Sequence, residues 1–327
     1  MPNSSEPTDV HRDEEILVGV SHCLLGAEVR YDGGHKRSRF VSDVLGEFVR
    51  FLPVCPEVEV GMTIPRETVR LEVVDGETRM VAPKSGKDHT SAMTRYAKRR
   101  VNALAKEPLC GYILKKDSPS CGMERVRLYR DTGIPKRVGR GLFAEALMAK
   151  LPHLPVEEEG RLNDPRLREN FIERVFAYRR LRDLFKGRWT VGKLVAFHSR
   201  EKLLLLAHHR PAYTELGRLV AKAKALPRGE LAETYQTTFL AGLERIATTR
   251  KHVNVLQHIA GYFKRLIDDG DRQELHEQIE AYRDGLVPLV VPLTLIKHHL
   301  RRHDVPYLEQ QSYLEPHPRE LMLRNHV

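Results

Sequence analysis

Three short apolar runs rich in β-branched residues, each leading into a cysteine, constrain the fold more than any other feature of the chain. The runs ILVGVSHC, VRFLPVC and CGYILKKDSPSC lead to Cys23, Cys55 and Cys121. An amphipathic stretch over 38–48 and a helix expected over 88–106 separate them. The order strand, helix, strand, helix, strand predicts a parallel sheet with right-handed crossovers, an α/β and Rossmann-like fold.

The three cysteines are expected to meet, because the carboxyl ends of parallel strands lie along one edge of a sheet. Their flanking segments HCLLG, VCPEVEVG and SPSCG combine cysteine with proline or glycine. Such tight loops turn backbone N–H groups toward the sulfurs and stabilise thiolates. Cys110 stands at the start of the third strand, so we expect it at the opposite edge, as a buried structural thiol.

Single free cysteines often only fill cores, but three at equivalent strand ends favour a metal site. Three thiolates fit either zinc with an open position or a [4Fe-4S] cluster with one iron that the protein does not hold. The spacing does not distinguish the two. The chain has no close C-x-x-C pair, and this favours a cluster assembled from separate loops.

The chain of 327 residues is long enough for two domains. The polar residues 1–14 are expected to be a disordered leader, and residues 15–152 form the α/β domain. Residues 153–165 are rich in proline and acidic residues, which is typical of a linker. Residues 166–327 are expected to be all-α, because apolar residues recur every three or four positions. Helices are expected over 166–185, 191–208, 212–225, 230–249, 251–267, 273–282 and 292–302.

Composition excludes some classes of protein and favours one class of partner. No apolar run approaches the length of a membrane span, and the first residues do not resemble a secretory signal, so we expect a cytoplasmic protein. Four cysteines are too few for a disulfide scaffold. The net charge is +10, from 25 basic and 21 acidic residues up to Pro155 and 29 and 23 beyond it. Both halves would attract a polyanion such as RNA, although many basic proteins bind none.

Several segments resemble known families. VSHCLLGAEVRYDGGHKR, LPVCPEVEVGMTIPRE and ILKKDSPSCG resemble the three signature segments of the thiouracil desulfurase family, over residues 14–150. FHSREKLLLLAHHRPAYTELGRLVA and KHVNVLQHIAGYFKRLI resemble the YbgA-type domain. The chain thus resembles fused two-domain proteins that are implied to remove sulfur from 4-thiouridine in tRNA. The resemblance also implies a [4Fe-4S] cluster held by Cys23, Cys55 and Cys121.

Such a reaction would be a hydrolysis of C=S to C=O with release of sulfide. The open iron would bind the soft thiocarbonyl sulfur as a Lewis acid, and water would attack the carbon. No net redox change is needed, so no nicotinamide or flavin is expected. Glu57 is the expected general base, with Glu59 as the alternative, and Ser118 or Ser120 would relay a proton or orient the water. Glu57 could instead pair with Arg66, and the serines could bond their own backbone.

The segment RYDGGHKR is expected to form a loop over the site, where its glycines let backbone approach a ligand. Neighbouring residues of a strand point to opposite faces, so only one of Lys115 and Lys116 should face the site, and we favour Lys115. The expected contacts to the uracil edge or a phosphate are Arg30, Asp32, Gly33, Gly34, Lys36 and Lys115. Simple solvation of these charges is the alternative interpretation.

Basic faces on two expected helices would contact RNA, or would be solvated faces without a partner. The expected RNA contacts are Arg95, Lys98, Arg99, Lys251, His252, Lys264 and Arg265.

Two other functions stay open from the sequence. The substrate could be free 2-thiouracil or a thionucleoside, or the protein could be a cluster-bearing RNA-binding protein or redox sensor without turnover. Basic charge in both halves favours thiolated tRNA. Glu57 and the two serines favour an enzyme, because a sensor does not need them.

Overall fold

The computed structural model describes residues 16–130 and 134–327, so the expected leader at 1–14 lies outside the described residues. A four-stranded sheet in the order β2-β1-β5-β8 forms the centre of the N-terminal part, and all of its pairs are parallel. Its strands are β1 (Leu17–Ser21), β2 (Arg50–Val54), β5 (Leu109–Leu114) and β8 (Val156–Glu158). The three strands expected before the cysteines are confirmed, as is the α/β fold class.

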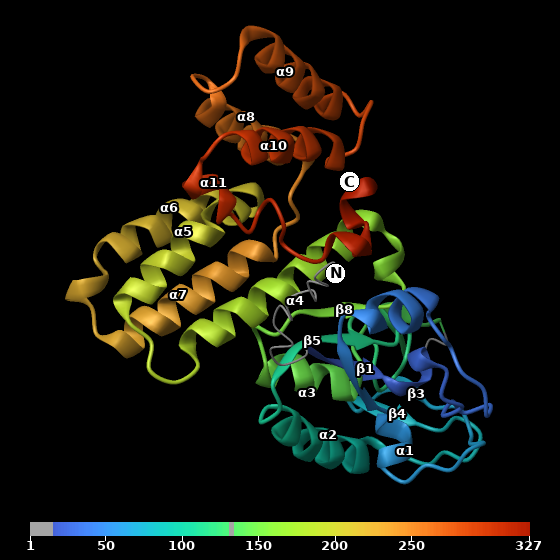
Figure 1. The fold of residues 1–327 in the computed structure, drawn as a ribbon. Helices are drawn as coiled ribbons and strands as arrows, with labels where there is room; N and C mark the ends of the chain where they lie inside the picture. The colour runs from blue at the N-terminus through green and yellow to red at the C-terminus, as the bar shows by residue number, and fades with distance from the viewer. Residues whose placement is uncertain (1–15, 131–133) are drawn as a thin grey trace, which may run out of the picture.

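Helices cover both faces of this sheet (Figure 1). Tyr112 and Leu114 pack with α2 (Thr90–Leu104) and α3 (Leu142–Lys150), whereas Val18 and Ile113 pack with α4 (Pro165–Phe185). Alternation along the strands produces the two layers. The Tyr112 ring lies over Gly19, where an added Cβ would come 2.2 Å from Cδ2 of the ring. Only glycine permits this close approach between the two central strands.

Short helical turns complete the N-terminal part. The stretch expected to be amphipathic over 38–48 contains a π-turn and a 3-10 turn rather than a regular α-helix. The short turns are η1 (His22–Leu25), η2 (Phe40–Val44), η3 (Leu45–Glu47) and α1 (Pro56–Glu59).

The expected linker at 153–165 is structured, which corrects our interpretation of its composition. It contains β8, the edge strand of the sheet, and η4 (Arg161–Asn163). Glu157 and Glu158 are buried there. Their carboxylates are compensated, since Arg161 Nε lies 2.6 Å from Glu157 Oε1 and the Met123 N–H donates to Glu158 Oε1 at 2.7 Å. The acidic residues are therefore hydrogen-bonded parts of the fold, and α4 follows directly onto the sheet.

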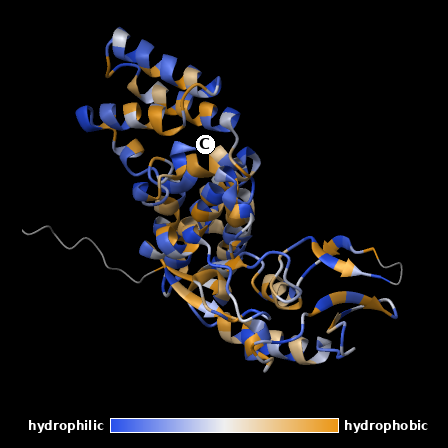
Figure 2. Cartoon of the chain, turned by 90° about the vertical axis from the view of Figure 1, so that its right-hand side faces the viewer, coloured by the Kyte–Doolittle hydropathy of each residue, from blue (hydrophilic) through white to orange (hydrophobic). Residues whose placement is uncertain are grey.

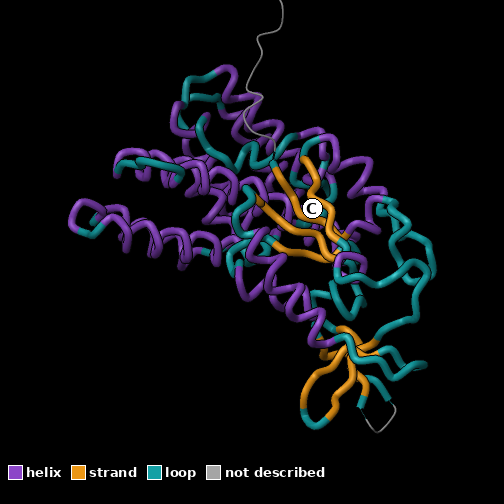
Figure 3. Tube along the Cα trace, turned by 90° about the horizontal axis from the view of Figure 1, so that it is seen from below, coloured by secondary structure: helices purple, strands orange, loops and turns teal. Residues whose placement is uncertain are grey.

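A second sheet, which the sequence did not lead us to expect, lies beside the first. Its order is β4-β3-β6-β7, with β3 and β6 parallel and the outer pairs antiparallel. The strands are β3 (Arg70–Val74), β4 (Glu77–Val81), β6 (Val126–Tyr129) and β7 (Lys136–Gly139). Leu71, Met80 and Leu128 bury one face of it. Figures 2 and 3 show its strands as a separate group that projects from the body of the molecule.

The C-terminal part is helical, as expected. Its elements are α5 (Val191–His208), α6 (Arg210–Ala221), η5 (Ala223–Ala225), α7 (Arg228–Leu243), α8 (Thr249–Phe263), α9 (Asp269–Arg283), α10 (Val290–Arg302), α11 (Pro306–Glu309), η6 (Arg319–Leu321) and η7 (Leu323–Asn325). The helix expected over 230–249 ends early, at Leu243, and the chain turns before α8 begins. In the part of the chain that the structure describes, no helix is long and apolar enough to cross a membrane.

A buried ionic cluster ties the C-terminal tail to α4. Arg324 Nε lies 3.1 Å from Glu169 Oε1, and its Nη2 lies 2.8 Å from Glu173 Oε1. His208 Nε2 lies 2.9 Å from the other oxygen of Glu173. Ligand-type atoms of Glu169, Glu173 and His317 lie within 4.8 Å of one another. Because Arg324 already compensates both carboxylates, we interpret the cluster as a structural tie and not as a metal site.

Replacing Arg324 with Met should therefore destabilise the fold. It would leave two buried carboxylates without their cation, and the free energy of unfolding should fall by about 3–5 kcal/mol. Arg319→Met is the matched control, because the Arg319 side chain is 86% exposed on the same tail. Urea unfolding of both variants checks this, and equal stabilities would show that the cluster does not hold the tail.

Candidate functional site

The three cysteines that end the strands line one cavity, as the sequence led us to expect. Cys23 lies in η1 after β1, Cys55 precedes α1 after β2, and Cys121 lies in the loop after β5. All three border a cavity of about 440 Å³, a volume suited to a small ligand or cofactor. Cys110 is buried and does not border it, and its Sγ lies 3.6 Å from the Pro108 carbonyl oxygen.

Local hydrogen bonds to the backbone of each cysteine shape the three loops. Gly26, at φ 97°, ends η1 and its N–H donates to the Cys23 carbonyl at 3.3 Å. This left-handed conformation favours glycine. The Cys55 N–H donates to Glu59 Oε1 at 3.1 Å, and the Cys121 N–H donates to Ser118 Oγ at 3.0 Å. The three thiols are therefore fixed from three separate loops.

The electrostatics of these thiols fit a cationic ligand. Burial raises the pKa of Cys23 to about 11, with a further rise from neighbouring Cys55. Burial also raises the pKa values of Cys55 and Cys121, and the charge of Cys23 contributes at Cys121. Three thiolates around one cavity are unfavourable without a cation, and a metal that binds them must displace their protons. The donor set therefore fits a thiophilic metal or an iron-sulfur cluster.

A chain of hydrogen bonds runs from the Cys121 loop to Glu57. Ser118 Oγ accepts the N–H groups of Ser120 and Cys121, so its own proton points to Ser120 Oγ, 2.9 Å away. Ser120 Oγ in turn donates to Glu57 Oε1 at 2.7 Å. The geometry orients a proton path from Ser118 through Ser120 to Glu57. Ser120 Oγ also lies 3.8 Å from Sγ of Cys121, so this chain of hydrogen bonds passes directly beside one of the three cysteine sulfurs.

Arg66 holds the other oxygen of Glu57. Its Nε and Nη2 lie 3.0 and 2.5 Å from Glu57 Oε2, and Nη2 also donates to the Val29 carbonyl at 3.0 Å. The pairing that we weighed as the alternative interpretation of Glu57 is thus present. It occupies Oε2 and leaves Oε1 for Ser120, so the two contacts fix the carboxylate facing the cavity.

Glu59 faces away from the cavity. Its carboxylate accepts from Tyr96 Oη at 2.8 Å and lies 3.1 Å from Arg100 Nε, both on α2. Glu59 therefore anchors the Cys55 loop to α2, and of the two candidate bases only Glu57 borders the cavity.

The expected substrate loop divides into two groups. Arg30 and Lys36 border the cavity. Asp32, Gly33 and Gly34 do not; Asp32 Oδ1 accepts the Gly34 N–H at 3.1 Å, which closes the turn.

Lys115 borders the cavity but is paired, with its Nζ 2.6 Å from Glu159 Oε1. Lys116 borders the cavity too, which corrects the expectation that only one of the two lysines faces the site. They lie in the loop after β5, where strand alternation no longer applies.

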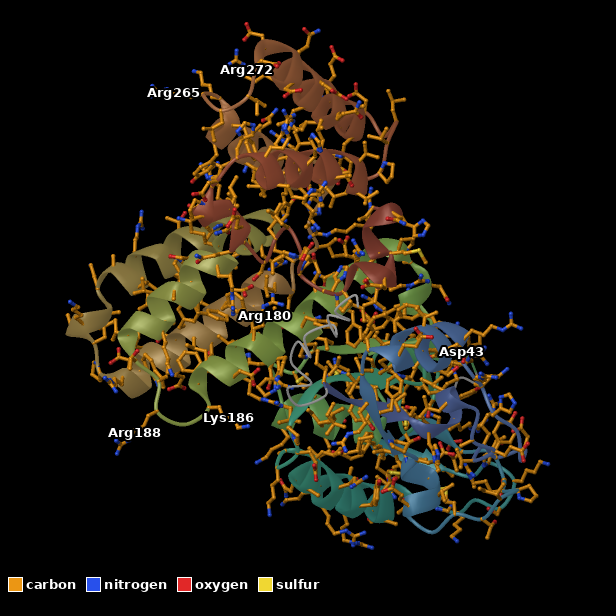
Figure 4. The ribbon with its side chains drawn as sticks, viewed as in Figure 1. Asp43, Arg180, Lys186, Arg188, Arg265 and Arg272 are labelled. Carbon is orange, nitrogen blue, oxygen red and sulfur yellow. The ribbon has the colours of Figure 1, made fainter. Side chains whose placement is uncertain are left out.

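The expected RNA contacts lie apart from the cavity. Those on α2 are exposed but do not border it. His252 is buried, with its Nδ1 3.0 Å from Tyr313 Oη, so it is a core residue and our prediction of a surface contact was wrong. Lys251 Nζ donates to the carbonyl of His208, the last residue of α5, and to the carbonyl of Ile246, so its charge caps the C-terminus of α5. Lys264 is exposed beside Arg265, which Figure 4 places at the end of the molecule farthest from the parallel sheet.

Several cavity residues were not expected as site residues. They include Arg66, Arg70, Arg127 and Tyr129. Arg66 was named only as a partner of Glu57, and the other three belong to the second sheet. The density of arginine after Cys121 could have indicated Arg127, but we counted it only as overall charge.

Comparison with known proteins agrees with this geometry. Residues 18–159 match the family model described as 2-thiouracil desulfurase. Residues 202–318 match a family described as a protein of unknown function, DUF1722. The chain is 33% identical over 156 residues to the uncharacterized protein YbbK of Bacillus subtilis, covering 45% of this chain and 99% of YbbK.

It is 36% identical over 165 residues to the uncharacterized protein YbgA of Escherichia coli, covering 50% of this chain and 98% of YbgA. The chain belongs to the 2-thiouracil desulfurase family, with a YbgA-type C-terminal part. A solved structure described as the [4Fe-4S]-dependent thiouracil desulfidase TudS is 34% identical, over 46% of this chain and 94% of that chain, with a TM-score of 0.38.

In this member of the thiouracil desulfurase family, Arg66 and Glu57 should be strongly coupled. Both side chains are mostly buried, at 7% and 15% exposed. In a double-mutant cycle with Arg66→Ala and Glu57→Gln, we expect a coupling energy of about 1.5–3 kcal/mol in unfolding.

The exposed pair of Arg37 and Asp43, 2.6 Å apart, is the matched control. Its cycle should give below about 1 kcal/mol, because water screens the pair. All variants are unfolded in urea with the same metal content. If the changes in the free energy of unfolding from Arg66→Ala and Glu57→Gln simply add in the double variant, the pairing is contradicted.

Proposed function

We propose that this protein hydrolyses the C=S bond of a thiolated uracil ring to C=O, with a [4Fe-4S] cluster held by Cys23, Cys55 and Cys121. The observation that carries the proposal is the meeting of three cysteines and the Ser118–Ser120–Glu57 chain in one cavity. The thiouracil desulfurase family model over residues 18–159 supports the same chemistry. A bound cluster with one iron free of protein ligands would supply a soft Lewis acid for the thiocarbonyl sulfur.

The residues of the chain supply positioning and proton transfer. Ser120 orients a water at the ring carbon, and Glu57 takes the proton of that water through Ser120 Oγ. Arg66 keeps the carboxylate turned toward the cavity. Water adds to the carbon, the C–S bond breaks, and the sulfur leaves as hydrogen sulfide, so atoms balance without an electron donor.

The proposed substrate is thiolated uridine in tRNA, most directly 4-thiouridine, with the helical part binding RNA in the cytoplasm. The basic excess in both halves of the chain supports an RNA partner. Free 2-thiouracil is the second candidate, which the description of the family model favours.

An anaerobic assay of sulfide release tests the function. The iron-loaded protein should consume thiolated tRNA faster than free 2-thiouracil, and Cys121→Ala should abolish both iron binding and turnover. Cys110→Ala is the matched control, because Cys110 does not border the cavity, and it should keep its iron. A loaded protein that consumes neither substrate would contradict the proposal and favour a binding or sensing protein.

Replacing Ser120 with Ala should separate catalysis from cofactor binding. The change breaks the path to Glu57 without removing a thiol, so kcat should fall by about 10²-fold or more while iron content is retained. Ser91→Ala, on the exposed face of α2, should leave kcat unchanged. A Ser120→Ala protein with wild-type kcat would exclude Ser120 from the proton path.

A further inference from the structure

The second sheet has one buried face and one polar face, and the polar face leads into the cavity. Leu71 and Leu128 are paired across β3 and β6 and are both buried. The next pair, Glu72 and Tyr129, points to the opposite face by strand alternation. Arg127 lies two residues before Tyr129, so it shares that face.

The residues of this face border the same cavity as the cysteines. Arg70, Arg127 and Tyr129 all line it. The Arg70 guanidinium lies over the Tyr129 ring, 4.4 Å from its centroid. A stacked arginine and tyrosine at the mouth of a cavity form a flat surface of the kind on which unpaired RNA bases stack. Arg70 is ion-paired with Glu72 on the same face, so the uncompensated positive charge of this face comes from Arg127.

The charges on β6 and β7 are unfavourable for the isolated protein. Arg127 is paired directly with Arg137 across the antiparallel strands, and like charges at such positions destabilise a sheet. Arg137 is compensated by Asp117 at 2.9 Å. Arg127 is exposed and has no carboxylate within ion-pair distance among residues 16–130 and 134–327. An anionic ligand would supply the missing compensation.

The same hairpin carries an excess of cations. Between Arg125 and Arg140 the sequence has six basic residues and one acidic residue. Arg125 and Arg130 are exposed close to Arg127 in the sequence, and Lys136 is exposed on the opposite face of the hairpin. By contrast, the basic residues expected on α2 and α8 do not border the cavity. Arg127 therefore adds to the cations Arg30, Lys36 and Lys116, which border the cavity from other loops.

We propose that the polar face of the second sheet, centred on Arg127 and Tyr129, binds the sugar-phosphate backbone of RNA beside the thiolated nucleotide. This inference rests on the proposed function and names the surface that distinguishes a polymer from a free base. The phosphates flanking the target contact Arg127 while the thiolated ring enters the cavity.

The test compares two substrates in each variant. For Arg127→Ala, the ratio of kcat/KM on thiolated tRNA to kcat/KM on free 2-thiouracil should fall about tenfold, because only the polymer has phosphates. Lys136→Ala should leave the ratio unchanged, because Lys136 is paired with Leu128 and so lies on the opposite face of the hairpin. The dependence of RNA affinity on salt should also weaken, with the log–log slope smaller by about 0.7 per lost contact. Lys224→Ala, an exposed residue on η5, is the matched control, and Arg99→Ala tests α2.

Each outcome decides the assignment. A lower ratio for Arg127→Ala, with Lys136→Ala, Lys224→Ala and Arg99→Ala unchanged, supports it. An unchanged ratio, an equal loss on both substrates, or a loss confined to Arg99→Ala overturns it. If the wild-type protein consumes no thiolated substrate at all, the proposed function fails first, and RNA affinity then tests the surface alone.

Discussion

The site depends on the way a parallel sheet gathers the carboxyl ends of its strands at one edge. β1, β2 and β5 run in the same direction, so the residues that follow them meet although they are up to 98 positions apart. The close packing of Tyr112 on Gly19 keeps the two central strands in register. Because apolar layers cover both faces, the edge is the place where polar chemistry can reach solvent.

Carboxylates then fix the loops at that edge. Glu57 is held by Arg66 and Ser120, and Glu59 ties the Cys55 loop to α2. Glu158 accepts the Met123 N–H, two residues past the third cysteine, and Glu159 pairs with Lys115 before it. The segment that joins the sheet to the helical part therefore also braces the Cys121 loop. Glu158 and Glu159 thus serve both the Cys121 loop and the attachment of the helical part.

The sequence predicted those features that local periodicity and strand direction determine. Three strands, the helices of the C-terminal part and the meeting of Cys23, Cys55 and Cys121 follow from patterns a few residues long. The second sheet was missed because its strands mix buried and exposed residues without a continuous apolar run, and because β3 pairs with β6, more than fifty positions later. His252 was misjudged because its partner Tyr313 lies 61 residues away. Hydrogen bonds between distant residues leave no local pattern.

We propose that one cluster bound by three cysteines lies beside the Ser120–Glu57 chain. Diffraction from anaerobically grown crystals, with anomalous data collected across the iron absorption edge, is the sharpest test. We expect a single cubane of iron and sulfide bonded to Sγ of Cys23, Cys55 and Cys121, with its fourth iron facing the cavity. A lone zinc ion at the three thiols, or iron bound elsewhere in the protein, would contradict it.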